Sequence, residues 1–249
     1  MSTKNPDNLY DQETINSKNM FARYSHRTRF KIGLEFIESR LVLGKVLDFG
    51  CGTGAFISQV NAIKKGAIIG YEPFYEERFE SDLPIYSEYE DLFKHAPYQT
   101  ITIFQVMEHL QWEEIEKTMN RFDELLDPDG VIIIEVPIEI GPIILIKELN
   151  RYRQKKARIY TSKKLWSYGL FEFIGTFLFG LPAKRIDPDI SFMEHKGFDF
   201  RALIRFIKQK GWKTKILCYS PLPIKTWYGN SNVFIQVTRS KTSMEGKLL

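Results

Sequence analysis

Val46-Leu-Asp-Phe-Gly-Cys-Gly-Thr-Gly-Ala-Phe56 is the stretch of the sequence that decides the fold. Its apolar start reads as a short strand and breaks at three glycines, Gly50, Gly52 and Gly54, before a helix expected over 55–63. Glycines let the chain turn sharply out of a strand and bring backbone N–H groups against a ligand, with the N-terminus of a helix behind them. The stretch therefore predicts a ligand-binding turn between a strand and a helix.

The glycines alone do not decide which ligand this turn binds. Gly50, Gly52 and Ala55 also satisfy the dinucleotide pattern G-x-G-x-x-A, which would suit a nicotinamide dehydrogenase. Glu72 follows the next expected strand, eighteen residues beyond the last glycine, where a carboxylate can accept both hydroxyls of an adenosine ribose. Asp48 would orient a cationic or amino-bearing group beside the turn and would repel a pyrophosphate. The two carboxylates favour an adenosine ligand with a positive charge.

Strands and helices alternate around this stretch at the spacing of βαβ units. The apolar runs predict strands at 45–49, 67–71, 100–106, 131–136, 213–219 and 232–239, with helices at 20–43, 55–63, 112–126 and 199–210. No helix fits between the last two strands, so we expect them to pair antiparallel. The pattern predicts a doubly wound α/β protein.

Length and composition set the outer limits. The 249 residues are 43% hydrophobic and 27% charged, which excludes wholesale disorder and suits one domain with a sizeable insertion. The two cysteines cannot build a disulfide framework. The polar first twenty residues contain no secretory signal, so we expect a cytoplasmic protein, at most peripheral to the inner face of the membrane.

Four segments, in order along the chain, resemble the class I S-adenosylmethionine-dependent methyltransferases. Residues 48–54 look like the first motif of that family, and 70–73 look like the second. Residues 103–110 look like the close of its fourth strand, and 126–137 like its fifth strand with the lead-in turn. The resemblance implies an enzyme whose methyl donor is S-adenosylmethionine.

The same resemblance implies a seven-stranded Rossmann-like sheet with an antiparallel last strand and a helical, aromatic insertion after the fifth strand. It divides the chain into an N-terminal polar arm and cap helix (1–44), a methyltransferase core (45–137 and 192–240) and an inserted lid, acceptor or dimerisation element (138–191).

Carried over residue by residue, the resemblance assigns a cofactor site. The glycine turn would pack on the methionyl part with Asp48 near its amino group, and Glu72 would hold the ribose. Glu90 or Asp91 would meet the adenine, and Arg23 or Tyr24 would close over the carboxylate. The cofactor-binding residues expected are Arg23, Asp48, Gly50, Cys51, Gly52, Gly54, Glu72, Pro73, Asp91, Gln105 and Met107.

Glu108, His109 and His195 are the candidate catalytic residues. Methyl transfer needs alignment and removal of the acceptor proton, and an alcohol acceptor needs a general base within reach. Glu108 and His109 follow the fourth strand, at the edge of the sheet where such folds bind ligands, and His195 precedes the last helix. The same residues partly resemble the ligands of magnesium-dependent RNA ribose methyltransferases, which carry a glutamate where this chain has Gln105. An amide weakens a hard-cation site, so no metal is expected.

The insertion carries the strongest local charge. Residues 147–164 hold eight basic residues and one acid, Glu148, and residues 165–181 are mostly apolar and aromatic but too short between charges to span a bilayer. A membrane-surface contact through 147–181 and a homodimer or lid element are both open readings. No RNA-binding module is recognisable, so nucleic acid is not an expected partner.

The function expected from the sequence is O-methylation of a small molecule or glycan, including lipid-linked acceptors of the surface-polysaccharide type. The alternatives are a magnesium-dependent RNA ribose 2'-O-methyltransferase and a non-catalytic methyltransferase-like binding module.

Overall fold

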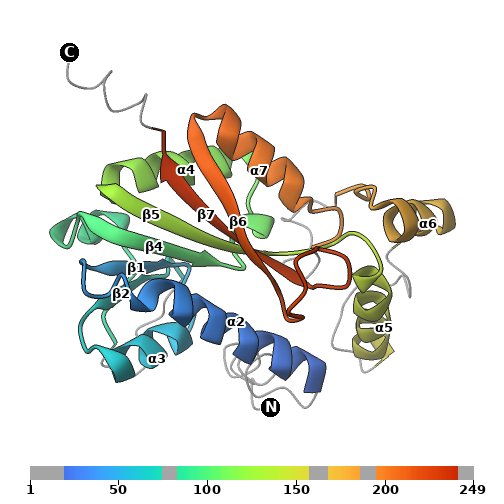
Figure 1. Ribbon diagram of the computed structural model, residues 1–249, viewed down its shortest axis with the longest axis horizontal. Helices are drawn as coiled ribbons and strands as arrows, with labels where there is room; N and C mark the ends of the chain where they lie inside the picture. Colours follow the sequence, from blue (N-terminus) through green and yellow to red (C-terminus); the bar gives the residue numbers. More distant parts are fainter. Residues whose placement is uncertain (1–19, 75–82, 157–167, 186–194, 241–249) are drawn as a thin grey trace, which may run out of the picture.

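The computed structural model describes residues 20–74, 83–156, 168–185 and 195–240. The N-terminal arm before residue 20 and parts of the insertion lie outside the described residues. Figure 1 shows a central twisted sheet with helices on both faces, and two further helices on the side of the molecule where the fifth strand ends.

The sheet has seven strands in the order β3-β2-β1-β4-β5-β7-β6. Its strands are β1 Val46–Phe49, β2 Ile68–Tyr71, β3 Ile85–Tyr86, β4 Tyr98–Phe104, β5 Leu126–Pro137, β6 Trp212–Ser220 and β7 Asn232–Arg239. The first five pair in parallel, and β7 runs antiparallel to both β5 and β6. The predicted doubly wound sheet with an antiparallel last strand is confirmed.

Two helical layers cover the sheet because successive strand residues point to opposite faces. Val46 of β1 packs in the core under α2 (Met20–Glu38) and α3 (Ala55–Ile63), whereas its neighbour Leu47 packs in the core under α4 (Trp112–Leu125) and α7 (Phe200–Gln209). Figure 1 shows α2 and α3 on one face and α4 and α7 on the other. Short 3-10 helices, η1 (Tyr89–Lys94) and η2 (Met107–His109), precede and follow β4.

Two element boundaries differ from the sequence prediction by five residues each, and β4 (Tyr98–Phe104) begins and ends two residues earlier than the expected 100–106. α2 ends at Glu38 rather than at residue 43, and the chain continues as hydrogen-bonded turns up to Gly44. β5 begins at Leu126 rather than at Val131, because the expected lead-in turn lies inside the strand as an irregularity of the β4–β5 ladder. The Asp127 carboxylate accepts the N–H of Asp129 there (3.0 Å), which satisfies one backbone N–H of the extra residues.

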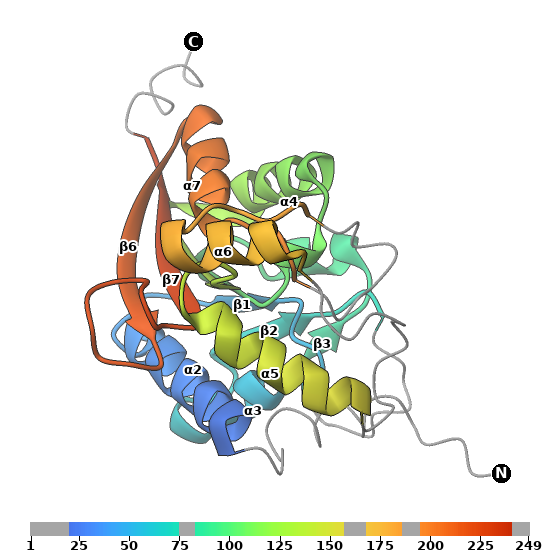
Figure 2. The same ribbon diagram turned by 90° about the vertical axis from the view of Figure 1, so that its right-hand side faces the viewer.

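The described part of the insertion consists of α5 (Ile143–Lys156) and α6 (Leu170–Phe179), which pack against each other. Figure 2, which turns that side toward the viewer, shows both helices in front of the sheet. The N–H of Gly141, just before α5, donates to the carbonyl of Thr176 in α6 (2.9 Å). Within the described residues, no helix combines the length and the apolar character that crossing a bilayer requires.

Candidate active site

The glycine turn has the backbone that the sequence predicts. Gly50, Gly52 and Gly54 have φ values of 76°, 53° and 77°, a region that other residues rarely adopt. A Cβ on Gly50 would lie 2.4 Å from the side chain of Val106, so the loop after β4 packs directly on the turn. A Cβ on Gly52 would meet nothing within 4 Å. Gly52 therefore offers its backbone to open space, as a ligand-binding turn requires.

Glu72 lies against this turn. Its carboxylate accepts the N–H of Gly52 at 3.0 Å and the N–H of Phe74 at 3.3 Å. Pro73 is exposed and lies between Glu72 and Phe74 in the sequence. The structure thus brings together the two features that the sequence places twenty residues apart, the glycine turn and the carboxylate that follows β2.

Asp48 is buried at the end of β1. Its carboxylate accepts a hydrogen bond from the Thr102 hydroxyl on β4 (2.8 Å). Burial raises the pKa of Asp48 to about 7, while the Thr102 hydrogen bond and the positive charge of Arg29 act in the opposite direction. A buried carboxylate of this kind is stabilised in its ionised form by a cationic group placed beside it.

Cys51 contributes backbone rather than a thiol to the turn. Its sulfur lies so close to β2 that a Cβ on Gly70 would stand 2.5 Å from it. Burial raises the pKa of the Cys51 thiol far above its usual range, so the thiol stays protonated and is not a nucleophile. Its placement explains why Gly70 of the second motif has no side chain.

Gln105 is the described non-glycine residue with a positive φ, 55°. Its N–H donates to the carbonyl of Glu135 on β5 (2.9 Å), and its side-chain amide donates to both carboxylate oxygens of Glu135 (3.1 Å each). Arg29 of α2, itself buried, lies 4.0 Å from the same carboxylate. These contacts hold the backbone of Gln105 in a strained conformation at the carboxyl end of β4.

Three other expected cofactor residues have different surroundings. Met107 is fully buried in the main core, so its side chain packs there and not on the surface of the site. Asp91 forms an ion pair with Lys94 on its own 3-10 helix (2.6 Å). Arg23 lies half-buried on α2. Their contacts with a cofactor stay predictions.

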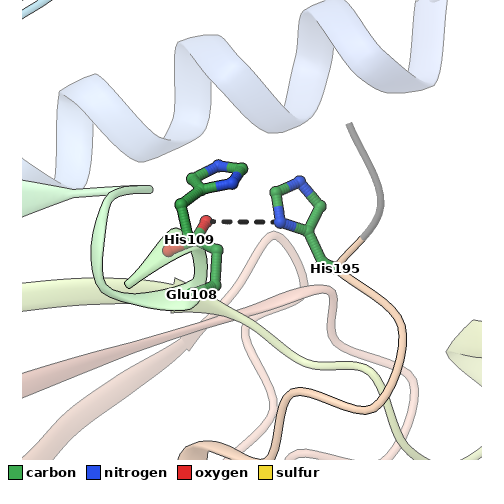
Figure 3. Close-up of side chains that lie close together, drawn as sticks. All are labelled: Glu108, His109 and His195. Carbon is green, nitrogen blue, oxygen red and sulfur yellow. Dashed lines mark ion pairs between the residues drawn. The ribbon is translucent and has the colours of Figure 1, made fainter. Parts of the chain in front are cut away.

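Glu108, His109 and His195 converge. The Nδ1 atom of His195 lies 3.8 Å from Oε1 of Glu108, and the rings of His109 and His195 meet edge to face with centroids 4.7 Å apart (Figure 3). The segment that carries Glu108 and His109 follows Val106, which packs on Gly50. The three side chains, called the acid–histidine cluster below, therefore include two that follow within three residues of the contact between Val106 and the glycine turn.

Burial governs the electrostatics of this cluster. The Glu108 side chain is completely buried, and neither of its oxygens accepts a hydrogen bond within the described part of the chain. Burial raises the pKa of Glu108 well above its usual range. Burial also lowers the pKa of His109 to about 4, and the positive charge of Arg185 acts in the same direction. His109 is thus neutral at pH 7, and Glu108 lacks the partner that a buried carboxyl normally has.

Arg185 fixes the segment on which the cluster is built. Its guanidinium donates to the backbone carbonyls of Glu108 (3.1 Å) and Leu110 (2.8 Å) and lies over the rings of Trp112 and Phe198. Arg185 comes from the chain that follows α6. The insertion therefore takes part in shaping the cluster.

The donor set of the cluster also fits a metal ion. One ligand atom from each of the three residues can be chosen so that all lie within 4.8 Å of one another. Two imidazoles and one carboxylate suit Mn²⁺, Fe²⁺ or Zn²⁺ better than Mg²⁺, which prefers oxygen ligands. The Gln105 amide, the fourth position of the magnesium-dependent pattern, is directed to Glu135 instead.

The strand order, the glycine turn and Glu72 define a class I methyltransferase fold. A methyltransferase-domain family model matches residues 19–172, which is more than half of the chain. This protein belongs to that family. The family, the fold class and the enzyme class predicted from the sequence are thereby confirmed, with S-adenosylmethionine as the methyl donor of that class.

Solved structures agree on the fold. The magnesium protoporphyrin IX methyltransferase ChlM from Synechocystis PCC 6803, with bound SAH, is 12% identical with a TM-score of 0.51, covering 94% of each chain. The plantazolicin methyltransferase BpumL in complex with SAH is 12% identical with a TM-score of 0.52, covering 94% of this chain and 96% of its own. A methyltransferase from Clostridium acetobutylicum ATCC 824 is 13% identical with a TM-score of 0.51, covering 95% and 100%. No curated protein matches closely enough to suggest a substrate.

Four residues that shape the site were not predicted from the sequence: Arg29, Thr102, Glu135 and Arg185. Glu135 could have been recognised from the sequence. A carboxylate inside the continuous β-branched run of β5 needs a hydrogen-bond or charge partner when both faces of the sheet are covered. Arg29 is one of several basic residues on α2, and nothing in the sequence singles it out.

Proposed function

We propose that this methyltransferase transfers a methyl group to an oxygen of a small-molecule or glycan acceptor, and that His195 removes the proton from that oxygen. The observation that carries the proposal is the convergence of the acid–histidine cluster in the segment that follows β4, whose Val106 packs on the glycine turn. An alcohol is a poor nucleophile until its proton leaves, whereas an amine needs no such cluster.

The cofactor half of the site is argued from the glycine turn. When bound, S-adenosylmethionine supplies an activated methyl group on a positively charged sulfur. Gly52 faces open space, and Glu72, already bound to its N–H, keeps lone pairs for ribose hydroxyls. The buried Asp48 would be held ionised by the amino group of the cofactor.

In the acceptor half of the site, the two histidines would have different roles. His195 presents Nδ1 toward Glu108, so its other ring nitrogen is the one that would take the acceptor proton. Burial raises the pKa of Glu108, and the positive charge of the imidazolium that forms on His195 would act in the opposite direction, so the Glu108 carboxylate would stabilise that imidazolium. His109, whose pKa is about 4, is a weak proton acceptor and would orient the acceptor through a hydrogen bond.

A labelled-methyl assay tests the reaction. The protein is incubated with S-adenosylmethionine carrying a labelled methyl group and with fractionated host extract, and the labelled product is identified by mass spectrometry and NMR. We expect a methyl ether on a hydroxyl of a sugar or small molecule. A product methylated on nitrogen or carbon would contradict the proposed chemistry.

A second candidate is metal-assisted O-methylation, as in the RNA ribose alternative. The specific observation in its favour is that the acid–histidine cluster forms a three-donor set that includes Glu108, whose oxygens accept no hydrogen bond within the described residues. Calorimetric titration of the chelator-treated protein with Mn²⁺ and Mg²⁺ measures binding without an activity assay. Micromolar Mn²⁺ binding that is lost in Glu108→Gln would favour this candidate over the metal-free one.

A further inference from the structure

Glu172, in the first turn of α6, brings three segments of the chain together around one carboxylate. It accepts the N–H of Gly169, just before the helix (3.3 Å), and the N–H of Lys184, beyond its end (2.8 Å). It also accepts a hydrogen bond from Nζ of Lys196, in the turn before α7 (2.6 Å). A negative charge is favourable at this position, because the N-terminus of a helix carries a partial positive charge. Glu172 is therefore held in place by its own helix as well as by its partners.

The Glu172 carboxylate is ionised because its hydrogen bonds outweigh its burial. Burial alone would raise the pKa of Glu172, but the hydrogen bonds from Lys196, Lys184 and Gly169 together hold that pKa below its usual range. The Lys196 side chain is the more deeply buried partner, 9% exposed against 27% for Glu172. Its ammonium also lies 4.7 Å from the centroid of the Tyr168 ring. A desolvated ammonium needs its carboxylate, so the ion pair fixes where Lys196 lies.

Lys196 belongs to the turn that carries His195. Phe198 closes this turn by donating its N–H to the carbonyl of His195 (3.1 Å). Gly197 within the turn has a φ of 81°, and a Cβ there would stand 2.4 Å from the Cα of Arg185. The turn therefore packs directly on the backbone that follows α6, while its Lys196 side chain is bound to α6 itself. Two contacts with the insertion thus hold the backbone of His195.

The other side of the acid–histidine cluster depends on the same carboxylate. Glu172 accepts the N–H of Lys184, and the next residue is Arg185. The Arg185 guanidinium donates to the backbone carbonyl of Glu108 (3.1 Å). The groups that Glu172 binds are thus one residue away from His195 on one side and from Arg185 on the other. The 3.8 Å between Nδ1 of His195 and Oε1 of Glu108 depends on both sets of contacts (Figure 3).

We propose that Glu172 is a positioning residue for the acid–histidine cluster, and that it places the His195 imidazole against Glu108 through the ammonium of Lys196. A general base must lie within hydrogen-bond reach of the proton that it removes, and a misplacement of about 1 Å can cost about a hundredfold in rate. The placement of the imidazole is independent of the reaction. Its effect on turnover rests on the proposed function, in which His195 removes the acceptor proton.

Histidine NMR tests this placement without an acceptor. The chain has four histidines, so protein made with ¹³C-labelled histidine gives few ring signals, and His109→Ala and His195→Ala assign those of the cluster. The 4.7 Å between the centroids of the His109 and His195 rings predicts a nuclear Overhauser cross-peak between them. We expect this cross-peak to be lost in Glu172→Gln and in Lys196→Met, because each variant removes one charge of the pair.

Asp123→Asn is the matched control. The Asp123 carboxylate is 33% exposed and pairs with Arg239 at 2.7 Å, so this pair resembles that of Glu172 but joins α4 to β7. The ring cross-peak should be unchanged in this variant, and urea unfolding shows that all variants are folded. Once the acceptor is identified, Glu172→Gln should lower kcat about a hundredfold with cofactor affinity retained, and Asp123→Asn should leave both unchanged.

Three results would overturn the proposal: a cross-peak retained in Glu172→Gln, one retained in Lys196→Met, or one lost in Asp123→Asn as well. The third would mean that the rings respond to any loss of stability. The NMR result and the labelled-methyl assay are independent of each other. A product methylated on nitrogen would contradict the proposed function and leave the placement of His195 intact, whereas a retained cross-peak would do the reverse.

Discussion

The two sides of the candidate active site differ in what forms them, backbone on one side and side chains on the other. The cofactor side is backbone: three glycines with positive φ, backed by a helix and bound by one carboxylate. The acceptor side is made of buried titratable side chains contributed by two distant segments, with the insertion holding both in place. Backbone geometry is encoded locally, whereas a meeting of side chains depends on the whole fold. The two sides should therefore respond to different substitutions.

The largest effect on cofactor affinity is expected at the glycine turn. Gly52→Val places a side chain where the ligand should approach, but no protein atom lies within 4 Å of its Cβ position. We expect cofactor affinity to fall at least a hundredfold while the protein stays folded. Gly66→Val is the matched control, because Gly66 also has a positive φ (74°) and open space but lies outside the site. Calorimetric titration with S-adenosylmethionine compares them, and equal affinities would place the cofactor elsewhere.

On the acceptor side, His195→Ala should lower kcat by about 10²–10⁴-fold with cofactor affinity retained, because a general base contributes on that scale. His109→Ala should lower kcat less, since a histidine with a pKa of about 4 takes up a proton poorly at pH 7. His95→Ala is the control histidine, which contacts Tyr86 instead of the cluster. Normal turnover in His195→Ala would remove this residue from the mechanism.

Glu72→Ala sharpens the comparison within the cofactor side. It removes a charged acceptor that also holds the N–H of Gly52, so we expect cofactor affinity to fall by about ten- to a hundredfold, the range of a lost charge-assisted hydrogen bond. Its kcat at saturating cofactor should change far less than that of His195→Ala. A titration showing unchanged affinity would mean that Glu72 only supports the turn.

The smallest effect concerns stability and pH. Burial raises the pKa of Asp48 to about 7 from 3.8, so the folded protein binds a proton there more tightly than the unfolded chain. The stability from this group is complete below pH 4 and is lost as the pH rises toward 7. Asp48→Asn should therefore gain on the order of 1–3 kcal/mol relative to the unchanged protein between pH 5 and pH 8.

Urea unfolding at several pH values measures this difference, with the exposed Asp129→Asn as control. A difference that does not change with pH would show that Asp48 titrates normally in the folded protein.

The core of the fold was predictable from the sequence except for the two-residue strand β3, whereas the bounds of α5 and α6 in the insertion were not predicted. Parallel strands covered on both faces must be continuous apolar runs, and the glycine turn fixes where the first one ends. The acid–histidine cluster was predictable in composition, since the residues after β4 and before α7 meet at the carboxyl edge of the sheet. The contacts of Glu135 with Gln105 and Arg29 were not predicted. No spacing of residues in the sequence indicates that a side chain of α2 reaches β5.

The sequence also does not predict which residues of the insertion are buried. Its apolar residues are evident in the sequence, but whether they face the core or water depends on the partner of each helix. Only the structure separates the buried Thr176 from the exposed Phe171 on the same helix.

The bond between Glu172 and Lys196 has a consequence for engineering and for evolution. Exchanging the insertion for that of a relative would also release the neighbour of His195, so turnover would change together with any change in acceptor. A chimaera should retain Glu172 and Arg185 from the original chain, and only then can the rest of the insertion be replaced as an independent module.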